Sequence, residues 1–149
     1  MKISTRGEYG LRAILDIALH YKQGPITLKS VAERQGISEP YLEQLISGLK
    51  KAGLVSSIRG SQGGYELARE PSQIKIGDII RVLEGPIAPV DCLLEDLDEK
   101  GCCNIQKCAT RLLWQKLRDS MIEVLDSTTL MDLVENAKGL DKDGNMYYI

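Results

Sequence analysis

The sequence predicts a mainly helical fold in which three helices precede a β-hairpin and a longer helix occupies the second half. Apolar residues recur at three- and four-residue intervals in residues 5–21, 28–35 and 38–53, which is the period of an amphipathic helix. Two short alternating segments flank a glycine-rich turn at residues 60–64, as in a hairpin. A single apolar stripe within residues 105–125 predicts the longer helix.

Local signals place the ends of the first two helices. The first helix is expected over residues 5–21, because Gln23-Gly24-Pro25 stops it. Thr27 is predicted to cap the N-terminus of a second helix over residues 28–35, and Gly36 to end it.

The third helix and the hairpin complete a recognisable order of elements. Ser38 is predicted to cap this helix, which tolerates Pro40 in its first turn. Two helices that meet across so short a turn form the helix-turn-helix pattern. Residues 54–59 and 65–67 then form a hairpin directly after the second of them, which is a wing. The first 85 residues are therefore predicted to be a winged helix-turn-helix domain.

The second half is expected to contain helices on both sides of residues 87–104, where apolar residues follow no regular spacing. Residues 76–83 predict a short helix, and residues 105–125 the long one, with its stripe on Leu113, Leu117, Met121 and Val124, widened by Trp114 and Leu125. Asp126-Ser127-Thr128 is predicted to end the long helix and to cap a last helix over residues 130–137. The expected division is a winged domain (1–85), a cysteine-bearing segment (86–104), a long and a final helix (105–138) and a tail (139–149).

The net charge of −2 conceals an uneven distribution. Residues 1–70 carry 10 Lys or Arg against 7 Asp or Glu, whereas residues 71–149 carry 9 against 14. A basic half beside an acidic half suggests that only the first contacts phosphate. No apolar stretch is long enough for a bilayer, and residues 1–6 lack a signal-peptide pattern, so we expect a cytoplasmic protein without membrane contact.

The third helix carries the residues expected to read bases. A helix held across a short turn can enter the major groove with its N-terminal residues against base edges. Gln44 can pair with adenine, and Glu39 or Glu43 can accept a hydrogen bond from cytosine N4. Arg59, at the end of the wing's first strand, can pair with guanine or follow a narrow minor groove.

Basic side chains of the same half are expected to contact phosphates, which position a protein on DNA without specifying sequence. The phosphate candidates are Lys29, Arg34, Lys50 and Lys51. Each residue taken singly is also typical of a solvated surface, so the prediction depends on the ordered set. The whole predicted DNA-binding set is Lys29, Arg34, Ser38, Glu39, Pro40, Tyr41, Glu43, Gln44, Lys50, Arg59, Ser61 and Gln62.

All four cysteines fall within seventeen residues, at Cys92, Cys102, Cys103 and Cys108. In a cytosolic protein such a cluster favours metal binding or redox chemistry over a disulfide framework. The spacing differs from the paired Cys-x2-Cys motifs of a zinc ribbon. Thiolates suit both zinc and iron–sulfur, so the pattern alone leaves the metal open.

The chain is not expected to be an enzyme. It has a single histidine, His20, and no nucleophile beside a base in a recognisable pattern. The turn at residues 60–64 lacks the lysine and hydroxyl residue of a nucleotide-binding loop.

Several segments together resemble the family of winged-helix transcription regulators that includes IscR and CymR. The resemblance extends through the cysteine segment and the long helix, so it covers nearly the whole chain. It implies a homodimer made through the long helix, a pseudo-palindromic operator in double-stranded DNA, and DNA contacts at Glu43, Gln44 and Arg59. The segments that carry it are Ile3-Ser4-Thr5-Arg6-Gly7-Glu8-Tyr9, Glu33-Arg34-Gln35-Gly36-Ile37-Ser38, Tyr41-Leu42-Glu43-Gln44-Leu45, Val55-Ser56-Ser57-Ile58-Arg59-Gly60 and Gly63-Gly64-Tyr65.

The iron–sulfur members of that family are matched further by Gly101-Cys102, Lys107-Cys108 and Leu113-Trp114. This resemblance implies a [2Fe-2S] cluster held by Cys92, Cys102 and Cys108, with Cys103 as an alternative to Cys102. Family members with a histidine ligand have it three residues after the last cysteine, where this chain has Arg111, a cation that cannot ligate. The fourth ligand is therefore open between Glu8 of the partner subunit's first helix, Cys103 and His20.

Three functions follow as hypotheses. The first is a repressor of iron–sulfur assembly genes whose affinity for its operator depends on cluster occupancy. The second is a repressor of cysteine metabolism that acts with the enzyme cysteine synthase. It is based on Met146-Tyr147-Tyr148-Ile149, which resembles the ending of the family member with that function. The third is a zinc-stabilised interaction protein without regulatory chemistry.

Overall fold

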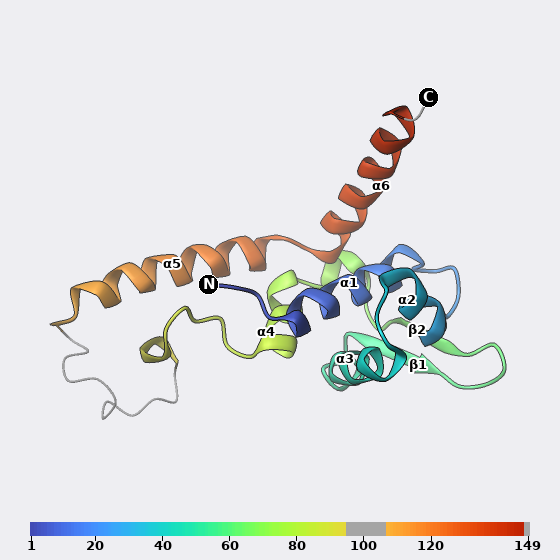
Figure 1. Ribbon diagram of the computed structural model, residues 1–149, viewed down its shortest axis with the longest axis horizontal. Helices are drawn as coiled ribbons and strands as arrows, with labels where there is room; N and C mark the ends of the chain where they lie inside the picture. Colours follow the sequence, from blue (N-terminus) through green and yellow to red (C-terminus); the bar gives the residue numbers. More distant parts are fainter. Residues whose placement is uncertain (95–106, 148–149) are drawn as a thin grey trace.

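Three helices and a hairpin form the head of the molecule (Figure 1). They are α1 (Thr5–Leu19), α2 (Leu28–Gln35), α3 (Glu39–Lys51), β1 (Val55–Ile58) and β2 (Gly64–Leu67). The computed structural model describes residues 1–94 and 107–147. The order of elements and the two-stranded antiparallel sheet confirm the predicted winged helix-turn-helix fold.

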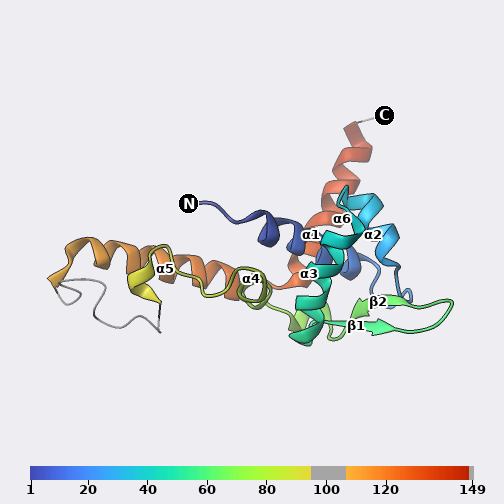
Figure 2. The same cartoon turned by 60° about the horizontal axis from the view of Figure 1, so that its bottom comes forward.

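The second half leaves the head along two helices that point in different directions (Figures 1 and 2). It contains the short turns η1 (Pro71–Gln73) and η2 (Asp91–Leu93) and the helices α4 (Ile76–Glu84), α5 (Ala109–Ser127) and α6 (Leu130–Tyr147). We refer to α5 as the arm. No helix in the described part of the chain is long and apolar enough to cross a lipid bilayer.

The caps that the sequence predicted around the helix-turn-helix are all formed. Thr27 Oγ1 accepts a hydrogen bond from the Ser30 amide at 3.1 Å, and Ser38 Oγ accepts one from the Tyr41 amide at 3.4 Å. Gly36 ends α2 in the left-handed conformation, with φ of 65°. The short turn between α2 and α3 therefore has a fixed path.

A single apolar core joins the head to α4 and to the start of α6. Each helix turns one apolar face inward, as the spacing of its apolar residues requires. The arm contributes no buried residue to this core. The largest fully buried side chains are Ile14, Leu42, Leu45, Ile46, Leu49, Ile74, Ile79, Leu130 and Pro71.

The hairpin is anchored to the head by a backbone bridge. Strand β1 pairs with β2 in the register Val55 with Leu67 and Ile58 with Gly64. Ile26, just before α2, then exchanges two hydrogen bonds with Tyr65: Ile26 N to Tyr65 O is 2.9 Å and Tyr65 N to Ile26 O is 2.7 Å. The wing is thus fixed at its base, and only its tip projects.

Gly64 makes this bridge possible, and Gly64→Ala is expected to destabilise the fold. The added methyl group would fall on the backbone oxygen of Ile26, so the bridge would have to open. We expect a loss on the order of 2 kcal/mol in the free energy of unfolding, measured by urea denaturation. Gly139→Ala is the matched control. That glycine lies in α6 with open space around its Cα, so the same change should stabilise the protein by about 0.5–1 kcal/mol.

The arm joins the head through α4. Arg81 forms a bidentate ion pair with Asp126 near the end of α5, with N–O distances of 2.8 and 2.9 Å. The backbones meet as well, because Ile76 N donates to Thr128 O at 2.9 Å and Leu130 N donates to Ile74 O at 2.8 Å. The C-terminal end of the arm is therefore fixed to the base of the head.

The Arg81–Asp126 pair predicts an acid-sensitive component of stability. The Arg81 guanidinium holds the pKa of the Asp126 carboxyl below its ordinary value, so the ionised form stabilises the fold above about pH 4, and this stabilisation disappears as pH falls through the lowered pKa. Asp126→Asn should lower the melting temperature at pH 7 and converge with the wild type near pH 2. Because Asp126 is 31% exposed, we expect a difference of about 1 kcal/mol or less.

Asp119→Asn serves as the control for that pH series. Asp119 pairs with the adjacent Arg118 but is 67% exposed, so its removal should leave the melting temperature unchanged at every pH. A constant difference between the Asp126→Asn variant and the wild type from pH 7 to pH 2 would contradict the assignment.

The structure corrects several helix ends. α1 stops at Leu19, and α5 starts at Ala109 because the Cys108 backbone is extended. The last helix is capped by Thr129, whose Oγ1 accepts from the Asp132 amide at 3.2 Å, and not by the three residues before it. It continues to Tyr147 instead of ending near residue 137. Gly139 did not end it because one exposed glycine costs a helix only about 1 kcal/mol.

Candidate nucleic-acid interface and thiol site

The outer face of α3 presents the predicted base-reading residues together. Leu42, Leu45, Ile46 and Leu49 fix the inner face of this helix in the core. The opposite side is exposed and carries Glu39, Pro40, Glu43, Gln44 and Lys50. Tyr41 is half-buried, and its ring packs edge-on against the ring of Tyr9 at a centroid distance of 6.4 Å. A rigid helix with a polar outer face is suited to enter a DNA groove.

The loop between β1 and β2 projects from the head, away from α3 (Figure 2). Arg59, Ser61 and Gln62 are exposed in this loop, and Ile58 at its start is 41% exposed. The tip is held by Gly63, where a Cβ would collide with the Ile58 backbone. The predicted wing residues therefore lie together in the loop between β1 and β2.

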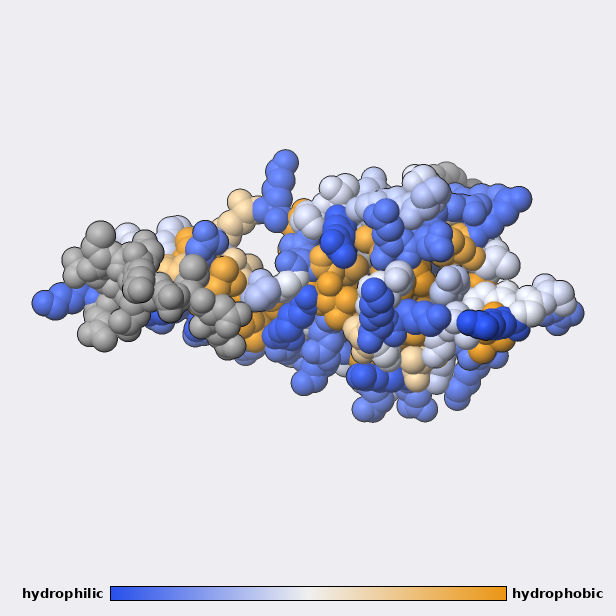
Figure 3. Space-filling model, turned by 90° about the horizontal axis from the view of Figure 1, so that it is seen from below, coloured by the Kyte–Doolittle hydropathy of each residue, from blue (hydrophilic) through white to orange (hydrophobic). Residues whose placement is uncertain are grey.

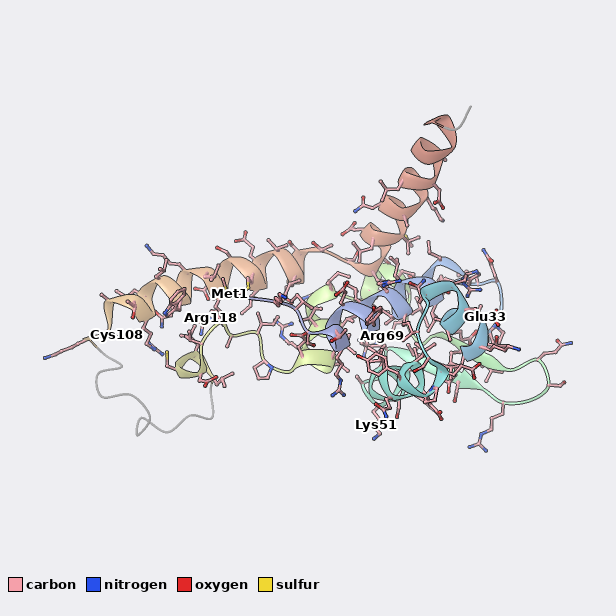
Figure 4. The ribbon with its side chains drawn as sticks, in the orientation of Figure 1. Met1, Glu33, Lys51, Arg69, Cys108 and Arg118 are labelled. Atoms are coloured by element: carbon pink, nitrogen blue, oxygen red, sulfur yellow. The ribbon has the colours of Figure 1, made fainter. Side chains whose placement is uncertain are left out.

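The predicted phosphate contacts differ in what they touch. Lys29, Lys50 and Lys51 are exposed, and Figure 4 shows Lys51 at the edge of the head. The Arg34 side chain is also exposed, at 40%, but it donates from Nε and Nη2 to the carboxylate of Asp16, at 3.0 and 2.6 Å. This ion pair raises the pKa of Arg34 through the hydrogen bond to Asp16.

Two described cysteines lie on either side of residues 95–106. Cys92 is in η2 and Cys108 precedes the first turn of α5, and both are free and half-buried. Figure 4 places Cys108 at the end of the arm, far from Lys51 on the head. Cys102 and Cys103 lie outside the described residues. Among the residues that are described, no three His, Cys, Asp or Glu side chains come together to hold a metal.

Hydrogen bonds at Cys108 favour the ionised form of its thiol. Its Sγ lies 3.2 Å from Thr110 Oγ1. A hydrogen bond from that hydroxyl, and then one from the Arg111 amide, lower the pKa of the Cys108 thiol below its ordinary value. Since a thiolate is the form that binds zinc or iron–sulfur, the donor chemistry fits the implied [2Fe-2S] group.

The structure also shows the candidates for a fourth ligand. Glu8 is exposed in the first turn of α1. His20 follows α1 as its C-cap, with Nδ1 2.8 Å from the Asp16 carbonyl oxygen, so this ring already has a local partner. Arg111 follows Cys108 by three residues, and its Nε is buried without a hydrogen-bond partner among the described residues.

Apolar side chains of the arm are exposed in the part of the chain that the structure describes (Figure 3). Leu113 is 57% exposed and Val124 is 63% exposed. Beside them, a mostly apolar hollow of about 410 Å³ opens between the N-terminal residues, the end of α4 and the side chains of Met121 and Leu125. Exposed apolar surface of this extent on a long helix is typical of a protein–protein interface.

The sequence analysis did not identify two acidic residues, Asp16 and Glu84, that make hydrogen bonds between separate segments of the head. Asp16 is 4% exposed and ties α1 to α2, and Glu84 accepts hydrogen bonds from the Ser4 amide and hydroxyl at the start of α1. Asp16 could have been found, because it interrupts the apolar face formed by Ala13, Ile14 and Ile17. No local pattern identifies Glu84, which acts on a residue eighty positions away.

The chain has a helix-turn-helix with an exposed polar face, a wing that follows it, and an arm with exposed apolar side chains. These features are typical of winged-helix transcription regulators. The chain belongs to the Rrf2 family, described as iron-dependent transcriptional regulators, whose model matches residues 3–136. The family resemblance found in the sequence is therefore confirmed.

Relatives of both kinds named in the sequence analysis match the chain. CymR of Bacillus subtilis is 51% identical over 149 residues, the full length of both proteins, and its solved structure matches with a TM-score of 0.76 over 91% of this chain and 98% of its own. IscR of Escherichia coli is 40% identical over 147 residues, 99% of this chain and 88% of its own length. The solved structure of T. potens IscR matches with a TM-score of 0.74 and 53% identity, over 92% of this chain and 88% of its own.

Proposed function

We propose that this chain is a homodimeric, cytoplasmic repressor of iron–sulfur assembly genes that senses cluster status through a [2Fe-2S] group on Cys92, Cys102 and Cys108. The observation that carries the proposal is the pair of free, half-buried thiols at Cys92 and Cys108, one on each side of a segment with two more cysteines. Cys108 has the lowered thiol pKa that cluster ligation favours.

The uncovered arm supports the dimer. Two copies that pack Leu113, Leu117, Met121 and Val124 against each other would remove this apolar surface from water, which is the main driving force for association. A symmetric dimer presents two reading helices to two half-sites, so the operator should be a pseudo-palindrome.

Contacts within this chain connect the cysteines to the DNA-reading helix. Cys108 begins the arm, and the other end of the arm is fixed to α4 by Arg81 and Asp126. α4 in turn packs against α1 and α3. A bound cluster would supply a reversible, oxidation-sensitive cross-link between the cysteine segment and the arm. A change in how the arm is held is then transmitted to the angle between the two heads.

Anaerobic reconstitution with iron and sulfide tests the proposal. We expect a coloured protein with about two iron and two sulfide per subunit, and apo and holo forms that differ in affinity for a promoter of iron–sulfur assembly genes. A colourless protein that copurifies with zinc would support the zinc-stabilised alternative and contradict the cluster. Equal DNA affinity of both forms would contradict the sensing role.

A second candidate function is a repressor of cysteine metabolism that acts with cysteine synthase. It is favoured by the 51% identity with CymR over the full length and by the ending Met146-Tyr147-Tyr148-Ile149. Pull-down of cysteine synthase by the intact chain, compared with a chain lacking these four residues, tests it. Capture by the intact chain alone would support this candidate, and capture by neither would contradict it.

A further inference from the structure

Asp16 is the one charged residue buried among the described residues. It is 4% exposed and lies on the inner face of α1, next to Ile17. A buried carboxylate is costly unless hydrogen bonds replace the water it has lost. The partners that Asp16 has acquired therefore indicate why the charge is there.

Within residues 1–94 and 107–147, the side chains that donate hydrogen bonds to the Asp16 carboxylate are those of the last two residues of α2. Arg34 donates from Nε to both carboxylate oxygens, at 3.2 and 3.0 Å, and from Nη2 at 2.6 Å. Gln35 donates from Nε2 at 2.9 Å. The next residue, Gly36, begins the turn to the reading helix. Asp16 thus fixes the end of α2 at the point where the chain turns toward the DNA.

Arg12, one turn before Asp16 on the same face of α1, also binds Gln35. Arg12 donates from Nε to Gln35 Oε1 at 3.1 Å and from Nη2 to the Gln35 carbonyl oxygen at 3.0 Å. Its guanidinium lies 5.0 Å from the centre of the Tyr9 ring, and that ring packs against Tyr41 in the first turn of α3. Gln35 is therefore held between an acid and a base of α1.

We propose that Asp16, Arg12, Arg34 and Gln35 are positioning residues that set the orientation of the reading helix, and that Arg34 does not act as a phosphate contact. Only Gly36, Ile37 and Ser38 separate the clamped end of α2 from α3, so a shift of Gln35 moves the first turn of α3. Base reading depends on that turn more sharply than phosphate contact does. The proposal rests on the DNA-reading role of α3.

The test uses the full-length dimer and two duplexes of equal length: the best-bound sequence selected by the wild type from a random pool, and a scrambled version of it. Gln35→Leu removes the central bridge while Asp16 keeps Arg34. We expect the ratio of specific to non-specific affinity to fall by about tenfold or more, with the salt dependence of binding unchanged. Lower stability alone would reduce the binding-competent fraction and leave that ratio unchanged.

Lys29→Gln is the matched comparison, because Lys29 is an exposed basic residue on the same helix as Arg34. Loss of a true phosphate contact should lower the slope of log affinity against log salt by about 0.9 per site and leave the ratio unchanged. Asp16→Asn combined with Arg34→Gln avoids an unpaired buried charge, and it should behave like Gln35→Leu.

Three results would overturn the proposal. One is a fall in the salt slope for the double variant that matches the fall for Lys29→Gln, since Arg34 would then contact phosphate. Another is an unchanged affinity ratio for Gln35→Leu in a folded protein. If the wild type selects no sequence from the pool, the DNA-reading role itself fails, and this outcome is distinguishable because it does not depend on any variant.

Discussion

Replacing Leu113 and Leu117 together with glutamate is expected to give a monomer that no longer binds an operator tightly. Leu113 is 57% exposed in the isolated chain, and both residues lie on the apolar stripe of the arm. Two glutamates facing their symmetry mates would replace apolar burial by like-charge repulsion. Sedimentation should show a single subunit, and operator affinity should fall by about 100-fold or more because the two half-sites are no longer bound by one particle.

Leu140→Glu is the matched control for that experiment. Leu140 is 71% exposed but lies on α6, away from the stripe of the arm, so this variant should stay dimeric and bind the operator as the wild type does. A double arm variant that sediments as a dimer would show that the two copies meet elsewhere.

The second large effect is expected from a pair of adjacent cysteines. Cys102→Ser should abolish the visible colour after anaerobic reconstitution, whereas Cys103→Ser should retain about two iron per subunit. The reason is that the family resemblance assigns Cys102 and Cys108, which are separated by five residues, to the cluster and gives Cys103 only as an alternative. Iron and sulfide counts with the absorption spectrum measure the difference.

These two variants are controls for each other, because they make the same chemical change one residue apart. Circular dichroism should show equal helical content in both, since the apolar core is formed by other residues. The reverse pattern would assign Cys103 as the ligand. Full iron content in both variants, and also in Cys92→Ser, would exclude a cysteine-held cluster.

Most of the head could be predicted from sequence because its signals are local. Thr27, Gly36 and Ser38 act on residues within one helical turn, and the hairpin follows from alternation around a glycine turn. The outer face of α3 was predictable as well, since burial of Leu42, Leu45 and Leu49 leaves Glu43 and Gln44 outside. These features need no information about distant segments.

The parts that sequence reasoning missed depend on distant partners or on weak local signals. Arg34 is exposed, as a surface base should be, but its ion pair with Asp16, eighteen positions earlier, could not be predicted from the sequence. The length of α6 was underestimated because Gly139 resembles a helix end, although its cost is small enough for the helix to continue.

The sequence by itself determined the order of the elements, the family and the grouping of the cysteines, since each follows from residues close together in the chain. Only the tertiary structure showed which charged side chains pair with one another across helices. The physical reason is that a charge that loses water on folding, wholly or in part, is stabilised by a partner that can lie far away in the sequence. The buried Asp16 pairs with residues at the end of α2, and Asp126, which is 31% exposed, pairs with Arg81 of α4.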